Sequence, residues 1–322
     1  MNVPAIDISV GNKECYIAVM DAKDVFKYSI VSRAEEDKKG YQRLLSEKRA
    51  KDIAQYINDG GIIPGCIILS AQNNSNLKFS NNEISFDENE DSFFVIDGQH
   101  RLYGAEYAEN EIKIPVYIFN NLNIPEEVQY FLDVNSKQKG VPKTLRIELT
   151  KFLSEPGSRD EIRLQLFNKL NEDPESPLFN RLSSTTSVPG KLSHVPFQQV
   201  INPLLEKEPM SVFDFEKKYM LLVNFLKAID TILSDNFGDS KRLTTTVFFN
   251  AIFNNFDMIY NRVVMKGNLQ VENFINVINP IKDIDFDEYK GTGKAADKEL
   301  TNEIKLRIET SFNSSENFDS LF

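Results

Sequence analysis

Short apolar runs separated by turn residues occupy the first part of the chain, a pattern typical of a domain that mixes helices and strands. Residues 5–32 have the alternating and β-branched character of strands, and the pair Gly11–Asn12 predicts a hairpin turn between the first two runs. Residues 46–58 place apolar side chains on one face at helical spacing, which predicts a helix. The pair Gly60–Gly61 predicts the end of that helix.

Three later apolar runs predict strands, and polar residues follow the middle one. The runs are residues 62–70, 93–96 and 114–119. Small or apolar residues then recur at three-residue steps from Leu102, which predicts a helix that begins in the polar residues before it. Pro125 and the two acids after it predict the start of another helix. The predicted order is helix, strand, strand, helix, strand and helix.

Beyond residue 150 the pattern changes to helices with aromatic and aliphatic stripes. The predicted helices are residues 160–171, 213–234, 244–265, 271–278 and 296–312. The turn-rich residues 172–210 are predicted to form an irregular connection. We therefore expect an α+β domain over residues 1–146 and an all-helical domain over residues 147–322.

The chain is acidic, with a formal net charge of −11 at pH 7 over 322 residues. This charge excludes a surface that attracts nucleic acid everywhere, because nonspecific affinity comes largely from the neutralisation of phosphates. Any DNA contact must be local. The best basic segment is residues 135–146, which holds Lys137, Lys139, Lys143 and Arg146 and no acid.

Cysteine usage and hydropathy favour a cytoplasmic protein. Two cysteines, Cys15 and Cys66, are too few for a disulfide framework and too far apart in the sequence for a close-spaced zinc pair. The N-terminus lacks a basic and apolar leader pattern, and no segment approaches the ~18 consecutive apolar residues of a membrane helix. We expect no membrane association.

The polar motif Asp97-Gly98-Gln99-His100-Arg101 lies between the central predicted strand and the helix after it. A helix N-terminus exposes backbone N–H groups and the positive end of the helix dipole, and Arg101 adds a fixed cation, so the motif favours an anion such as phosphate. Asp97 can cap the helix, orient His100 or Arg101, hold a metal bound to phosphate, or act as a base. The alternative is that Asp97 is an N-cap in an ordinary turn and Arg101 lies on a solvated helix face.

Residues 95–102 resemble the signature of the DGQHR-domain proteins, whose best-known members are the DndB proteins of DNA phosphorothioation gene clusters. Residues 40–43, the predicted elements around the motif and residues 134–139 together resemble three blocks of the ParB/sulfiredoxin superfamily. In that superfamily a short motif that ends in arginine at a helix start contacts nucleotide phosphates. The resemblance spans residues 40–146.

The superfamily resemblance implies a ParB/sulfiredoxin-like fold for the first domain and a nucleotide-binding site in it. Gly98 and Arg101 match the phosphate-binding box, Gln99 and His100 lie in its variable middle, and Asn135 lies near the asparagine of the third block. The box is not the Gly-Glu-Arg-Arg of ParB, so specificity for CTP is not implied. Glutamine stands at position 99 where sulfiredoxin has its catalytic cysteine, so sulfinic acid reduction is not expected.

The resemblance to DndB implies a bacterial or phage protein of DNA modification or defence that binds a nucleotide, foremost ATP with Mg²⁺, can hydrolyse it, and binds DNA as a regulator. In the implied catalytic set of Asp97, His100 and Arg101, the arginine holds phosphate while Asp97 or His100 orients water or a metal ion. Asp97 is the candidate metal ligand. The candidate DNA-contacting residues are Gln42, Arg43, Lys137, Gln138, Lys139 and Lys143.

Two alternatives remain open. One is a ParB-like metal-dependent nuclease, because the DGQQR motif of certain restriction enzymes is close to residues 97–101, although such cutting needs clustered carboxylates or histidines. The other is a non-enzymatic adaptor whose helical domain binds another protein of a modification or restriction system. A homo-oligomer is compatible with the sequence. His194, the second of the two histidines, is expected to pack or cap.

Overall fold

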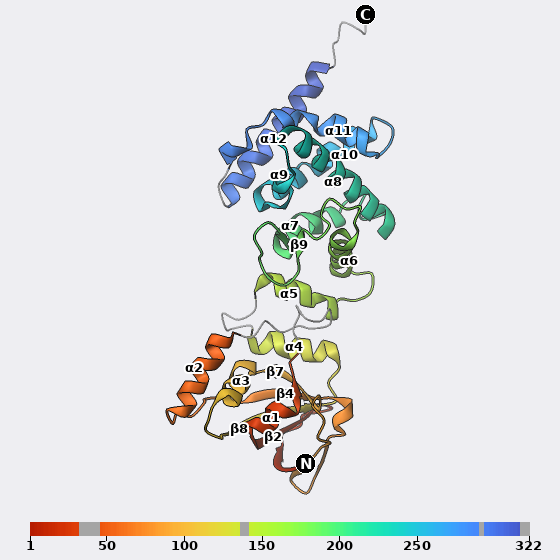
Figure 1. The fold of residues 1–322 in the computed structure, drawn as a ribbon. Coiled ribbons are helices and arrows are strands. Elements are labelled where there is room, and N and C mark those ends of the chain that lie inside the picture. Colours follow the sequence, from red (N-terminus) through yellow and green to blue (C-terminus); the bar gives the residue numbers. More distant parts are fainter. Residues whose placement is uncertain (32–45, 136–141, 290–292, 316–322) are drawn as a thin grey trace, which may run out of the picture. The chain divides into compact units, whose positions relative to one another are not determined.

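The computed structural model describes residues 1–31, 46–135, 142–289 and 293–315. The chain divides into two compact units, Met1–Val141 and Pro142–Phe322 (Figure 1). This division lies slightly before the boundary expected after residue 146, so Lys143 and Arg146 belong to the second unit.

Within the described residues, the first unit is built on an eight-stranded sheet with the order β3-β7-β4-β8-β2-β1-β6-β5. Its strands are β1 (Asn2–Asp7), β2 (Glu14–Asp21), β3 (Ser29–Ile30), β4 (Ile67–Ala71), β5 (Lys78–Ser80), β6 (Glu83–Ser85), β7 (Phe93–Asp97) and β8 (Lys113–Asn120). The predicted hairpin is confirmed, because β1 and β2 pair antiparallel with Ala5 opposite Ala18. β7, which carries the motif, lies between β3 and β4.

Helices cover both faces of β7. The helices of this unit are α1 (Ala22–Lys27), α2 (Glu47–Asn58), α3 (Gln99–Tyr107) and α4 (Ile124–Asn135). Phe93 and Val95 of β7 share a buried cluster with Leu102 of α3. Ile96 alternates to the opposite face, where α4 contacts β7. The four apolar residues of β7 are therefore buried, and Asp97 at its end is partly exposed.

Two local features set the start of α2 and its packing on α3. Ser46 caps α2, because its hydroxyl accepts a hydrogen bond from the backbone N–H of Arg49 at 3.4 Å. Gly104 of α3 lies against Ile53 of α2, and a Cβ at residue 104 would lie 2.4 Å from Cγ2 of that isoleucine. Glycine is required there, since the two helices approach too closely for a larger residue. One face of α2 is thereby fixed next to the start of α3.

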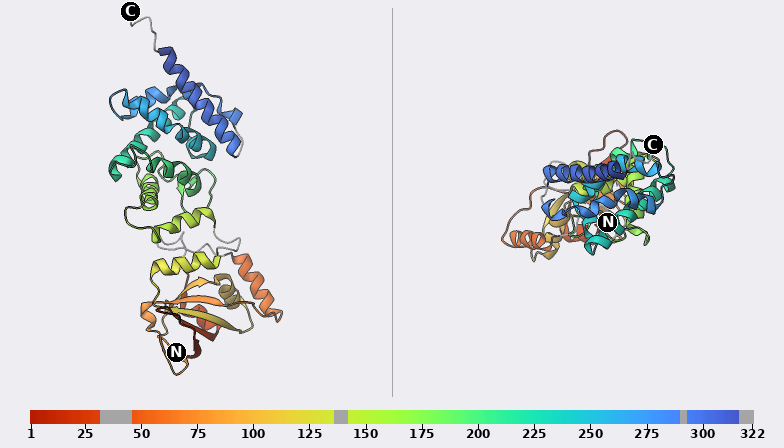
Figure 2. Two further views of the ribbon diagram at one scale, coloured as in Figure 1. Left: turned by 180° about the vertical axis from the view of Figure 1, so that it is seen from behind. Right: turned by 90° about the horizontal axis from the view of Figure 1, so that it is seen from above.

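The second unit is helical, as the sequence predicts (Figure 1 and Figure 2). Its helices are α5 (Lys143–Leu149), α6 (Arg159–Glu172), α7 (His194–Leu205), α8 (Phe215–Phe237), α9 (Thr246–Asn254), α10 (Phe256–Val264), α11 (Val271–Ile278) and α12 (Lys294–Ser315). A two-residue parallel pair, β9 (Leu182–Ser183) with β10 (Leu192–Ser193), is the departure from an all-helical unit. The core is aromatic, and the ring of Phe225 lies 5.1, 5.1 and 5.8 Å from those of Phe253, Phe256 and Phe274.

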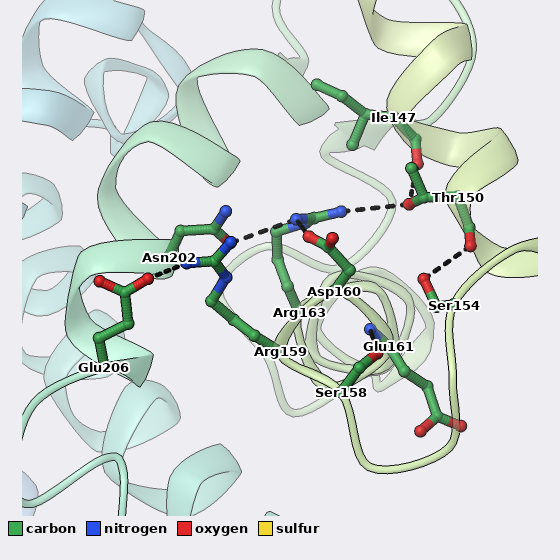
Figure 3. A network of polar contacts seen from close by, with 10 residues as sticks. All are labelled: Ile147, Thr150, Ser154, Ser158, Arg159, Asp160, Glu161, Arg163, Asn202 and Glu206. Atoms are coloured by element: carbon green, nitrogen blue, oxygen red, sulfur yellow. Dashed lines mark hydrogen bonds and ion pairs between the residues drawn. The ribbon is translucent and has the colours of Figure 1, made fainter.

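A buried arginine joins the first three helices of this unit. Arg163 of α6 is 0% exposed and pairs with Asp160 one turn earlier. Its guanidinium also donates to Oδ1 of Asn202 in α7 at 3.2 Å and to Oγ1 of Thr150, just after α5, at 3.3 Å (Figure 3). Since burial of a guanidinium is costly without partners, these contacts fix the packing of α5, α6 and α7.

Four local predictions are wrong. Residues 22–27 form α1 instead of a strand, because the side chain of Asp21 caps a helix there. β4 begins at Ile67 and not at residue 62, since the left-handed Gly65 (φ +91°) interrupts the extended chain. Residues 172–210 contain α7 in addition to irregular chain, and the predicted helix 244–265 is two helices divided at Asn255.

Candidate functional site

The central strand and the helix after it meet at a sharp turn. β7 ends at Asp97, Gly98 adopts the left-handed conformation with φ +102°, and α3 begins at Gln99. A Cβ on residue 98 would lie 2.6 Å from Cδ1 of Ile67, so the backbone angle and the neighbouring strand both require glycine. The predicted position of the motif at a helix N-terminus is thus confirmed.

Arg101 forms an ion pair within the motif. Its Nη2 donates to Oδ2 of Asp97 at 2.6 Å, and the two side chains are 25% and 24% exposed. The guanidinium also lies against two glycines: a Cβ on Gly65 would be 2.4 Å from Nη1, and one on Gly98 would be 3.3 Å from Nη2. Arg101 is therefore paired and partly buried. A guanidinium has five N–H donors, so the pair leaves donors for an anion.

His100 connects α3 to α2. Its Nε2 accepts a hydrogen bond from the backbone N–H of Ser46, the N-cap of α2, at 3.1 Å. A ring nitrogen that accepts carries no proton, so in the neutral ring the proton is on Nδ1. Nε2 can act on a ligand only after this bond opens. Asp97 is consequently the better placed of the two groups to orient water or a metal ion.

A cavity of about 490 Å³ adjoins the motif. It is lined by Arg49, Asp52, Ile53 and Tyr56 of α2, Ile63 and Pro64 of the following loop, residues 96–101, and Phe131 and Asn135 of α4. This volume is within the range of small-molecule sites. The structure therefore brings residues 98–101 and Asn135, the nucleotide-binding set that the resemblance implies, together with the candidate catalytic residue Asp97.

Asn135 is held at the end of α4. It is 6% exposed, and its Nδ2 donates to the carbonyl oxygen of Phe131 at 2.8 Å. Two turns earlier on α4, Glu127 is buried and accepts a hydrogen bond from Nε2 of Gln72 at 2.8 Å. Burial raises the pKa of Glu127 despite the hydrogen bonds from Ser70 and Gln72. The contact anchors α4 to the sheet and so positions Asn135.

Cys66 lies near Arg101 but is not an activated thiol. Burial raises the pKa of Cys66, and the nearby positive charge of Arg101 offsets this effect only in part. A thiol with a raised pKa is mostly protonated at neutral pH and is a poor nucleophile. Cysteine chemistry is therefore not a feature of the candidate site.

Of the residues expected to contact DNA, the structure describes Lys143. Gln42, Arg43, Lys137, Gln138 and Lys139 lie outside the described residues. Lys143 is exposed and begins α5 of the second unit, and Arg146 is exposed on the same helix. Their DNA-binding role stays a prediction.

Sequence reasoning missed the contribution of α2. Arg49, Asp52 and Tyr56 line the pocket together with Ile53, which also packs on α3. Their spacing of three and four residues places them on one helical face, and that spacing was visible in the sequence. What the sequence does not reveal is that this face meets the DGQHR turn, because the contact joins segments about 50 residues apart.

The metal hypothesis rests on Asp97 alone. Across the ranges that the structure describes, no three His, Cys, Asp or Glu side chains gather closely enough to hold a metal ion. A divalent cation at Asp97 would therefore have to share its ligands with the phosphates of a bound nucleotide. The clustered carboxylates that a two-metal nuclease needs are not found among these residues.

A comparison with known protein families shows to which family the chain belongs. The family model described as "DndB: DNA-sulfur modification-associated" matches residues 3–273. The chain belongs to the DndB family. This result confirms the relationship that residues 95–102 indicated and associates the protein with DNA-sulfur modification.

Other comparisons add little beyond the family. No curated protein matches the DndB-family chain. Two solved structures are similar at 13% identity: the C2221 form of a Pnob8-like ParB N-domain, with a TM-score of 0.33 over 94% of this chain and 99% of that one, and a pNOB8-like ParB N-domain, with a TM-score of 0.31 over 96% and 99%. Among the described residues, no helix combines the length and apolar character needed to cross a membrane.

Proposed function

We propose that this DndB-family protein binds a nucleoside triphosphate, foremost ATP with Mg²⁺, in the pocket beside the DGQHR turn, and that the bound nucleotide controls its action on DNA. The observation that carries the proposal is the position of Arg101: its guanidinium is fixed at the N-terminus of α3 and borders a cavity of about 490 Å³. A helix N-terminus and a fixed guanidinium together favour phosphate.

The charge balance of the pocket supports a requirement for Mg²⁺. Two arginines, Arg49 and Arg101, and two carboxylates, Asp52 and Asp97, line it, so these four formal charges sum to zero. A free triphosphate would bring several negative charges to this neutral set. Mg²⁺ bound to the phosphates would lower that charge, and Asp97 would be a ligand for it.

Hydrolysis would use Asp97. The carboxylate lies at the end of β7 beside the phosphate-binding turn, whereas Nε2 of His100 is occupied by the N–H of Ser46. Asp97 can accept a hydrogen bond from an attacking water or hold the Mg²⁺ that polarises the phosphate. Phosphate release that is lost in Asp97→Asn while ATP still binds would support this role.

DNA binding would use the basic segment that precedes and begins α5. Lys143 and Arg146 are exposed there, and Lys137 and Lys139 are close in the sequence. The association of the family with DNA-sulfur modification supports DNA as the partner. We propose a cytoplasmic regulator of such a system, with other proteins of the system as further partners.

Isothermal titration of the full chain with ATP, CTP and GTP, each with and without Mg²⁺, tests the nucleotide proposal. We expect saturable binding of ATP that strengthens when Mg²⁺ is present. Absence of binding by all three nucleotides in both conditions would contradict it and would favour the adaptor alternative. Incubation with modified and unmodified plasmid in Mg²⁺ or Mn²⁺ checks the nuclease alternative, for which DNA cutting would be the decisive result.

A further inference from the structure

Tyr56 is an exposed aromatic residue in a fixed position. It lies in the last turn of α2, is 51% exposed and lines the pocket. Its ring rests on Gly61, because a Cβ there would lie 2.4 Å from Cε1 and 2.5 Å from Cζ of the tyrosine. The backbone N–H of Gly61 also donates to the carbonyl oxygen of Tyr56 at 2.9 Å. The close approach of glycine therefore sets where the ring lies.

The loop after α2 runs from this ring to the DGQHR turn, residues 97–101. Ile63 and Pro64 line the pocket, and Gly65 lies against Nη1 of Arg101. The lining thus includes the apolar or aromatic residues Tyr56, Ile63 and Pro64 in addition to the charged and polar residues of the pocket. Phosphate alone would make no use of these three residues, and a ligand with a flat apolar end would cover them.

We propose that Tyr56 forms a nucleobase subsite, in which the base stacks on its ring beside Ile63 and Pro64 while the phosphates lie at Arg101. This inference rests on the proposed nucleotide binding. It adds a site for the base, which is the part that differs between ATP and other nucleoside triphosphates. Stacking of a base on an aromatic side chain changes affinity by about five- to a hundredfold and is tolerant of sequence because every base has a π-face. A purine offers the larger face, so the subsite favours purine over pyrimidine nucleotides.

Variants of Tyr56 distinguish the contribution of the base to the affinity from that of the phosphates. We expect Tyr56→Ala to weaken Mg²⁺–ATP binding about five- to a hundredfold and to leave the affinity for Mg²⁺–tripolyphosphate unchanged. Tyr56→Phe keeps the ring and should keep the affinity for ATP. Tyr107→Ala is the matched control, because Tyr107 is similarly exposed at 45% on α3 and does not line the pocket. Isothermal titration of the full chain measures all four proteins.

A spectroscopic signal checks the stacking itself. The fluorescence of etheno-ATP, a purine analogue, should fall when it saturates the wild type and Tyr56→Phe, and should fall less when it saturates Tyr56→Ala. Wild-type protein that binds neither ATP nor tripolyphosphate would overturn the proposed function and this inference together. ATP binding that is equal in wild type and Tyr56→Ala, or losses that are equal for ATP and tripolyphosphate, would overturn the subsite and leave the nucleotide site in place.

Discussion

Nη2 of Arg101 donates to Oδ2 of Asp97 at 2.6 Å across the turn that joins β7 to α3. The pair exists because the left-handed conformation of Gly98 reverses the chain. Asp97 at the end of β7 can therefore meet Arg101 in the first turn of α3. A guanidinium that is already oriented loses less freedom on binding phosphate. The ion pair therefore prepares the anion site and fixes the direction from which a ligand can approach.

Gly65 controls the position of Arg101 without being part of the motif. Gly65→Ala should weaken ATP binding at least about tenfold, because its Cβ would lie 2.4 Å from Nη1 and would displace a charge-assisted donor. Isothermal titration measures the affinity. Gly11→Ala is the control: Gly11 also has a positive φ of +61°, but no atom lies within 4 Å of its Cβ position. If both variants bind ATP like the wild type, the contact with Arg101 does not matter for the ligand.

The buried Arg163 should contribute far more to stability than its exposed neighbour. Arg163→Ala should lower the free energy of unfolding by about 3 kcal/mol or more, because it opens a cavity and removes hydrogen bonds to Asp160, Asn202 and Thr150 (Figure 3). Arg159→Ala, on the same helix, should change it by less than about 1 kcal/mol, since Arg159 and Glu206 are 47% and 57% exposed. Urea unfolding followed by circular dichroism compares them. Equal losses would contradict the structural role assigned to Arg163.

Acid should destabilise the second unit through His194 and Glu148. Nε2 of His194 lies 2.7 Å from Oε2 of Glu148. Burial lowers the pKa of His194 below its ordinary 6.5. Burial raises the pKa of Glu148, but its hydrogen bonds with His194 and Lys151 prevail and bring it below the ordinary 4.5. As the pH falls, the unfolded chain therefore binds protons at a higher pH than the folded chain does. The stability of the second unit falls as the pH drops below about 6.5, and falls further below about 4.5.

The melting temperature of the helical signal, measured by circular dichroism between pH 7 and pH 4, tests this sign. His194→Gln retains a donor for Glu148 and should flatten the fall between pH 7 and pH 5. His100→Gln, at the other histidine of the sequence, should retain the wild-type fall. A wild-type melting temperature that stays constant from pH 7 to pH 5 would show that His194 is not held neutral.

DNA binding should depend on α5 and not on the pocket. Replacing Lys143 and Arg146 by alanine should weaken DNA binding at all sequences and reduce the slope of log affinity against log salt by about one per residue, because each contact releases counterions. The ATP affinity of this double variant should equal that of the wild type. Fluorescence anisotropy with a labelled duplex at several salt concentrations gives the slope. An unchanged slope would place the DNA contacts elsewhere.

The sequence was sufficient to predict those elements whose determining interactions are local. The apolar run 93–96, the Asp97–Gly98 turn and the spacing from Leu102 predicted β7 and α3 correctly, since strand, turn and helix signals all lie within about a dozen neighbouring residues. The hairpin of β1 and β2 was predictable for the same reason. The resemblance at residues 95–102 then led to the correct family.

The features that the sequence did not reveal depend on long-range packing. The sequence analysis placed Tyr56 in a predicted helix and Gly65 in the predicted strand 62–70. The place of Tyr56 in the pocket and of Gly65 against Arg101 follows from how α2 and its loop lie against α3. α7 was missed because Pro196 suggests irregular chain, although it lies in the first turn, where proline is tolerated. The burial of Arg163 depends on partners in α7 and just after α5, which its position in a predicted helix does not reveal.

Titration of ATP with Mg²⁺ into wild-type protein, Arg101→Ala and the surface control Arg159→Ala tests the central claim most directly. Loss of one or two charge-assisted hydrogen bonds should weaken binding by Arg101→Ala about tenfold to several hundredfold, while Arg159→Ala binds like the wild type. The far-ultraviolet circular dichroism of all three should coincide, since Arg101 is not part of the buried hydrophobic cluster of its unit. Equal ATP affinity in wild type and Arg101→Ala, with the fold intact, would contradict the phosphate site at the DGQHR turn.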